Sequence, residues 1–297
     1  MNTVAESALP LRTYRQERRR VLLRKWLDNR LLTTGSGIIA LVVAIAFLGP
    51  VLVPYTPLEM DAVNRLTGPS WTHLFGTDNF GRDVFSRVVY GTRSSIIISL
   101  SVTVIASLIG MLVGLLSAYY ALLDHILMRI CDGLFAFPSI LLAIAIMSTL
   151  GPKTSNVVIA LSIIFIPSIA RIIRSAALVV REKTFIEALH AQGAGPWRII
   201  WLHIAPNTLS PLIIQASFVF AVTILTEAAL SFLGAGIPAP QPSLGNILYD
   251  GKIVIYSAWW MTVFPGILVI LIVLGLNLFG DGLRDLLDPK LTSGRGK

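Results

Sequence analysis

Four charged side chains in the segment "TDNFGRDVFSR" stand close enough in sequence for general acid–base chemistry: Asp78, Arg82, Asp83 and Arg87. Such chemistry also needs a nucleophile or a metal beside the acid and the base. No nucleophile accompanies the four, the histidines of the chain have no metal-ligand spacing, and the single cysteine excludes an intramolecular disulfide or a cysteine metal cluster. The sequence therefore indicates no catalytic and no metal-binding residue. Ion pairs and caps that shape a short surface helix over residues 83–90 are the favoured interpretation.

The second candidate for chemistry is Glu227, a lone carboxylate that follows the uncharged run Ile199–Thr226. A carboxylate at the end of a long apolar run should face a partner, a cavity or water. Two interpretations stay open. Glu227 either lines a pathway or gate, or caps a helix through hydrogen bonds where the apolar run ends.

The elements that must position these residues are membrane helices. Hydrophobic residues make up 55% of the chain and charged residues only 13%, whereas soluble domains carry roughly one quarter charged residues. A helix needs about 20 apolar residues to cross a hydrocarbon core of about 30 Å. Six runs meet that requirement: Leu31–Leu58, Ser94–Leu123, Gly133–Pro152, Thr154–Ala170, Ile199–Thr226 and Ile253–Gly280. The stretch Ala228–Tyr249 is also uncharged, but its alternating prolines predict a loop beyond the end of the fifth helix.

The net charge of +8 indicates the orientation of the chain in the membrane. Seventeen Arg and Lys residues lie before Leu31, between Arg171 and Arg198, and after Asp281, whereas five lie in the other two large connections. Because positive residues favour the cytoplasmic side, both termini are predicted to be cytoplasmic. The predicted division is a basic segment 1–31, a first span 32–54, an outer (periplasmic) segment 55–93, a five-helix core 94–280 and a tail 281–297.

The basic segment predicts an amphipathic helix over residues 11–32 that lies on the inner membrane face. An anchor that only sets the topology is an equally good interpretation.

The cytoplasmic connection "TFIEALHAQGAGPWRIIWLHIAPN" predicts two short helices joined by a turn. Thr184 and Glu187 have the spacing of a capping box, Gly193 can take a positive φ at the turn, and Pro196 suits the first turn of the second helix. The residues Trp197, Ile200, Trp201 and Ile204 fall at helical spacing and predict one apolar stripe. This stripe must bury against the membrane surface or against another protein.

The same stretch resembles the EAA loop of the permeases of ATP-binding-cassette (ABC) importers. The segments "FGTDNFGRDVFSRVVYGTRSS", "EAALSFLGAGIPAPQPSLGNIL" and "NLFGDGLRDLLDPK" are similar to the second, C-type permease of the dipeptide, oligopeptide and nickel subfamily. The resemblance implies an all-α bacterial inner-membrane protein with six transmembrane helices, of which the last five form the importer core. The residues that it implies for coupling to an ATPase are Thr184, Glu187, Ala188, Gly193, Pro196, Trp197, Ile200, Trp201 and Pro206.

The implied partners are a homologous second permease, two ATPases and a periplasmic solute-binding protein. The chain has no phosphate-binding motif of the form GxxxxGK[ST], so ATP is expected to be used by the partners, and no cofactor is expected on this chain. Di- and oligopeptides are the predicted substrates, with nickel, metal chelates or glutathione as alternatives within the family. An ion-driven secondary transporter and an intramembrane enzyme are less favoured, because few buried ionisable groups and no catalytic motif occur.

Overall fold

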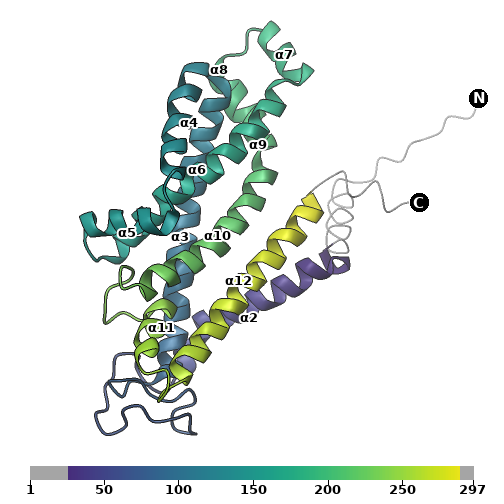
Figure 1. The fold of residues 1–297 in the computed structure, drawn as a ribbon. Helices are drawn as coiled ribbons and strands as arrows, with labels where there is room; N and C mark the ends of the chain where they lie inside the picture. The colour runs from purple at the N-terminus through teal and green to yellow at the C-terminus, as the bar shows by residue number, and fades with distance from the viewer. Residues whose placement is uncertain (1–25, 288–297) are drawn as a thin grey trace, which may run out of the picture.

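The computed structural model describes residues 26–287, and Figure 1 shows that helices dominate them. Five helices among these residues are long and apolar enough to cross a membrane: α2 (Arg30–Leu52), α3 (Val84–Tyr119), α6 (Thr154–Arg181), α10 (Leu209–Phe232) and α12 (Trp260–Leu287). The all-α class and five of the six predicted spans are therefore confirmed.

The predicted third span is not a straight helix. Two helices take its place, α4 (Ala121–Phe135) and α5 (Ser139–Leu150), and they meet at an angle of 95°. Pro138 stands immediately before α5, and a proline cannot donate the backbone hydrogen bond that would continue α4. The pair passes the membrane-span criteria only when it is taken together, as one broken span or a re-entrant loop.

The helices do not begin and end where the predicted apolar runs do, in part because a charge marks the edge of the hydrocarbon and not the end of a helix. The predicted surface helix over residues 83–90 is the beginning of α3, and α6 continues past Ala170 through Arg171 and Arg174 to Arg181. α10 begins only at Leu209, and α12 begins at Trp260 and extends into the predicted tail. The loop predicted beyond the end of the fifth helix, up to Tyr249, includes most of a further helix, α11 (Leu244–Ile253).

The two ends of the bundle carry different structures. Figure 1 places the short helices α7 (Thr184–Ala191) and α8 (Pro196–Arg198) at the top and α11, with the long connection 53–83, at the bottom. The chain continues from α8 through a π-helix, η1 (Ile199–Ile204), and one further turn, α9 (Ala205–Asn207), into α10.

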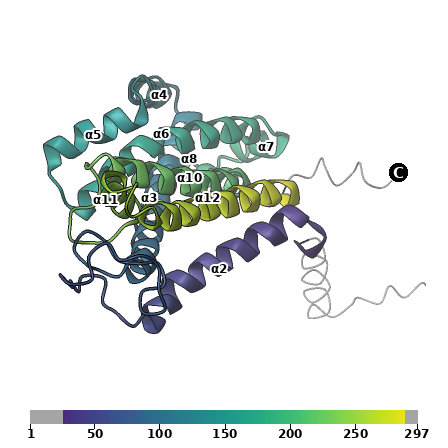
Figure 2. The same ribbon diagram turned by 60° about the horizontal axis from the view of Figure 1, so that its bottom comes forward.

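Glycines let the membrane helices approach closely. Added Cβ atoms at Gly110 and Gly114 of α3 would lie 2.8 Å from the Cβ atoms of Ile169 and Ile173 of α6. α2 lies along α12 (Figure 2), where an added Cβ at Gly35 would lie 2.5 Å from the Phe279 amide nitrogen. Lipid supplies no hydrophobic force between helices, so small residues bring the backbones into contact.

Most of the predicted basic helix over residues 11–32 lies outside the described residues. α2 begins at Arg30, after Asn29, whose side chain accepts hydrogen bonds from the backbone amides of Leu31 and Leu32. This cap fixes where the first membrane helix starts.

Candidate functional site

The turn of the connection between α6 and α10 is built as the sequence predicts. Gly193 has φ +78°. The Gly193 amide donates to the His190 carbonyl oxygen at 3.0 Å, and the Ala194 amide donates to the Leu189 carbonyl oxygen at 3.0 Å. This pair of bonds is the Schellman arrangement, which satisfies the last carbonyls of α7. We call residues 184–207 the elbow.

The start of α7 differs from the predicted capping box. Lys183 is the N-cap, Thr184 is already the first helical residue, and no side chain bonds to the free amides. The backbone of Lys183 is extended immediately after α6 ends, so the helix starts one residue too early for Thr184 to cap it. The side chains of Thr184, Glu187 and Ala188 are exposed instead.

The predicted single apolar stripe is also wrong. Trp197 and Trp201 are 64% and 39% exposed, whereas Ile200 and Ile204 are almost completely buried. The π-helix separates them, because its wider turn changes the spacing of side chains around the axis. The Ala205 amide donates to the carbonyl oxygen of Ile200, five residues earlier, which is the hydrogen bond of a π-helix. Pro206, the next residue, has no amide hydrogen with which to form the α-helical bond.

The buried side of the elbow joins the membrane core. Ile199, Ile200 and Ile204 belong to the same hydrophobic cluster as Ile173 and Ala177 of α6. Ile186 of α7, 1% exposed, anchors the first short helix in this cluster, and no pattern in the sequence singled it out. The elbow therefore packs directly against α3 and α6 through η1.

The exposed side of the elbow carries several large apolar side chains. The indole rings of Trp197 and Trp201 meet edge to face with centroids 5.9 Å apart. Leu202 is 65% exposed and Phe185 of α7 is 41% exposed. Large apolar groups in one exposed area indicate a surface that another molecule covers.

At the opposite end of the bundle, the four charged residues of the first candidate site are buried. Asp78 accepts from Arg82 Nε at 2.6 Å and lies 3.1 Å from Arg87 Nη1. Both guanidinium groups also lie 3.3 Å from Asp250 Oδ2 of α11. Asp83 caps α3 by accepting from the Ser86 amide at 2.7 Å. The predicted ion pairs and cap are confirmed, but their position on an exposed surface is wrong.

The sequence did not predict that Asp250 belongs to this cluster, because it lies more than 160 residues along the chain from the two arginines that it contacts. Burial raises the pKa of its carboxyl group, and Arg87 and Arg82 act against that rise. The cluster ties the connection 53–83 to α3 and α11. It contains no nucleophile, and among the described residues no group of His, Cys, Asp and Glu could hold a metal ion.

Charges also pair where α6 leaves the apolar region. Arg174 Nη2 donates to Asp124 Oδ2 at 2.6 Å, and Arg171 Nη2 donates to Asp132 Oδ1 at 2.7 Å. These bonds hold α4 against α6.

Glu227 lies inside α10 and not at its end, so its interpretation as a helix cap is wrong. The side chain is completely buried. Its carboxylate accepts one hydrogen bond from Ser95 of α3 and one from Ser231 of α10, each at 2.8 Å. The Ser231 hydroxyl accepts in turn from the Ile237 amide of the following loop at 3.2 Å. Whether Glu227 lines a pathway stays a prediction.

Comparison with known proteins adds family information to this geometry. Residues 106–293 match the family model described as the binding-protein-dependent transport system inner membrane component. Residues 18–69 match the model of the N-terminal TM domain of oligopeptide transport permease C.

Curated relatives match over most of the chain. A putative peptide transport system permease protein from Brucella abortus biovar 1 is 46% identical over 90% of each chain. A dipeptide transport system permease protein from Alkalihalophilus pseudofirmus is 46% identical over 89% of this chain and 88% of its own. A glutathione transport system permease protein from Pectobacterium atrosepticum is 41% identical over 91% and 90%.

A solved structure shares the fold. A chain of the MetNI methionine ABC transporter, in an inward-facing conformation, aligns with a TM-score of 0.58 and 22% identity. The alignment covers 68% of this chain and 97% of that chain.

Proposed function

The chain belongs to the family of binding-protein-dependent transport system inner membrane components, and from this premise we propose which step of import each end of the molecule performs. The chain is a multi-pass permease subunit of an ABC importer, a family in which ATP is used by partner ATPases. The elbow receives the movement of an ATPase, and the opposite end faces the solute-binding protein.

The observation that carries this proposal is the two-sided elbow. Its exposed side presents Trp197 and Trp201 to a partner, and its buried side packs Ile199 and Ile200 into the core formed with α3 and α6. Buried aromatic anchors commonly dominate the energy of an interface. When a partner that binds the two indole rings moves, the buried isoleucines transmit the movement to the membrane helices against which they pack. Ile200 contributes to coupling from behind the surface and not by contact with the ATPase.

We assign peptides as the substrate class, because the relatives named for peptide and dipeptide transport are 46% identical to this chain. Glutathione, the solute named for another relative, is itself a small peptide and is the nearest alternative. Identification of the solute that copurifies with the cognate binding protein tests this assignment. A metal chelate in place of a peptide would contradict it.

The working unit contains a second, homologous permease, because one core of five spans cannot enclose a pathway for a peptide. The test is uptake by vesicles that contain this chain, the second permease, the ATPases and the binding protein, with each component omitted in turn. Uptake should require all of them. Full uptake without the second permease would refute the heterodimer, and uptake without any ATPase would favour an ion-driven transporter.

The proposed topology places both termini and the elbow in the cytoplasm and α11 outside. Seventeen Arg and Lys residues in the three inner segments, against five in the two outer ones, support it. In a Cys131→Ser background, a cysteine at the fully exposed Tyr256 should react with an impermeant reagent from outside. A cysteine at the exposed Gln192 should react only after the membrane is opened. The reverse pattern would invert the topology.

A further inference from the structure

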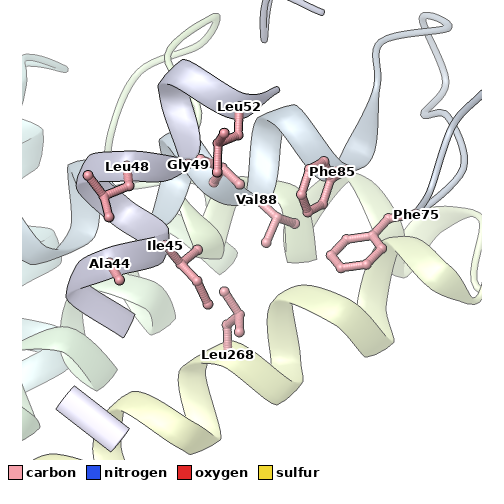
Figure 3. A pocket seen from close by; sticks show the side chains of 10 residues that line it. Ala44, Ile45, Leu48, Gly49, Leu52, Phe75, Phe85, Val88 and Leu268 are labelled. Atoms are coloured by element: carbon pink, nitrogen blue, oxygen red, sulfur yellow. The ribbon is translucent and has the colours of Figure 1, made fainter. Parts of the chain in front are cut away.

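An apolar cavity of ≈ 300 Å³ opens between α2, α3 and α12, near the C-terminal end of α2. Figure 3 shows Ile45 of α2 and Leu268 of α12 pointing toward each other across it, with Phe75 and Phe85 at the other end. All ten lining residues are apolar. None of the functional proposals above uses this space.

The cavity exists because α2 makes close contact with two different helices. Near its start α2 meets α12, where Gly275 approaches Ile38. Near its end α2 meets α3, where an added Cβ at Gly49 would lie 2.6 Å from Val89 Cγ1. The slot remains between these contacts. Phe75, stacked on Phe264 of α12 with ring centroids 3.9 Å apart, forms a rigid wall.

The mouth of the cavity opens toward the lipid. Leu48 and Leu52 line the cavity and are 62% and 78% exposed, and Val51 beside them is 84% exposed. They lie in the last third of a helix with the length and composition of a membrane span. The medium that surrounds such a surface consists of acyl chains.

We propose that this cavity is a binding site for one acyl chain of a membrane phospholipid. The lipid comes from the leaflet that holds the C-terminal end of α2, which is the outer leaflet in the topology proposed above. Water is a poor occupant, because the lining offers it no hydrogen-bond partner. A peptide segment is equally poor, because its backbone groups would find no partner there. A volume near the lower limit of small-molecule pockets, about 300 Å³, fits a narrow chain.

The bound chain fills the gap between α2 and α12 and supports the wall formed by Phe75. An empty slot would leave its lining atoms without dispersion contacts on one side. The acyl chain supplies those contacts, and it links the position of α2 to the connection 53–83.

Photolabelling tests the site without requiring transport. The full chain, in the complex with its partners, is placed in vesicles of phosphatidylethanolamine and phosphatidylglycerol that contain a phosphatidylcholine with a diazirine on its acyl chain. After irradiation, mass spectrometry locates the label. Label should concentrate on the end of α2 and on the part of α12 around Leu268. Label spread evenly over the exposed faces of the membrane helices would overturn the proposal.

Matched variants separate the cavity from the surface. Ala44→Phe fills the slot from α2 and should lower the labelling of the cavity by about tenfold, because it displaces several acyl methylenes from apolar surface. Leu268→Trp fills the slot from α12 and should act in the same way if the first variant folds poorly. Leu41→Phe adds an aromatic ring to an exposed position of α2 outside the cavity and should leave labelling unchanged.

The rival occupant is a side chain of the second permease. A photoreactive residue at Leu268 distinguishes the two, because it should crosslink to lipid. Crosslinks to another protein, or equal labelling in Ala44→Phe and Leu41→Phe, would refute the acyl-chain site.

Discussion

The elbow exposes large apolar side chains, whereas the opposite end of the bundle buries charged ones. Trp197 and Trp201 present their rings at the elbow surface. Asp78, Arg82 and Arg87 are enclosed at the other end and meet one another at hydrogen-bond or ion-pair distance. An exposed apolar surface is incomplete without a partner. The buried charges are paired within the chain, and removing one of the two arginines leaves the other alone to neutralise both Asp78 and Asp250.

The difference teaches how one chain serves two roles. Damage at the elbow should change what the chain binds, and damage in the buried cluster should change whether the chain folds.

Arg87→Ala should have the largest effect. It removes a buried cation that lies against Asp78 and Asp250, and loss of one partner from a buried pair costs about 3–5 kcal/mol. We expect a strongly reduced amount of folded chain and a lower thermal transition of the purified complex. The control is Arg198→Ala, which removes an exposed arginine at the elbow and should leave the transition unchanged. Equal stability of both variants would contradict the division between the two ends.

Gly193→Val should uncouple transport without unfolding the chain. Gly193 has φ +78°, a region that costs a β-branched residue about 1–3 kcal/mol. The elbow should swing or melt while the membrane helices stay in place. We expect normal membrane abundance and pairing with the second permease, but loss of bound ATPase or of uptake per ATP hydrolysed.

A matched control stands two residues away. Gly195 has φ −69°, and an added Cβ meets nothing within 4 Å at either glycine. Gly195→Val should therefore keep the ATPases. If Gly193→Val also keeps them and transports normally, the elbow contacts lipid headgroups and not an ATPase.

Glu227→Gln tests a residue that is buried like the ion pairs but lies inside the membrane helix α10, next to α11. The amide keeps the shape of the side chain, but it has one acceptor oxygen in place of the two that accept from Ser95 and Ser231. We expect uptake to fall several-fold while the yield of assembled complex stays normal. The control Ser95→Ala removes one donor and keeps the carboxylate. A variant that transports normally and only melts earlier would assign Glu227 to stability alone.

Local signals predicted much of the elbow, whereas distant contacts could not be predicted. The positive φ at Gly193 and the place of Pro196 follow from the chemistry of single residues. The long helices follow from composition. The 95° break between α4 and α5 and the pairing of Arg87 with Asp250 depend on neighbours that the sequence does not place. The prediction of a single apolar stripe was wrong for a local reason. It assumed α-helical spacing of the side chains, and the π-helix changes that spacing.

Neighbouring residues of the elbow give the finest test, because Ile200 and Trp201 should fail in different ways. Trp201 is 39% exposed beside Trp197, so Trp201→Ala should weaken ATPase binding by about 1–2 kcal/mol, the loss expected for an interface anchor. Its thermal transition in the absence of ATPase should barely change.

Ile200 is completely buried in the core shared with α3 and α6, so Ile200→Ala should lower the free energy of unfolding by about 2–5 kcal/mol. What remains folded of Ile200→Ala should still bind the ATPase, because its indole surface is intact. Titration of the ATPase and thermal unfolding on the same preparations separate the two outcomes. If Trp201→Ala lost stability and Ile200→Ala lost only affinity for the ATPase, the assignment of binding to the exposed side of the elbow and of stability to the buried side would be wrong.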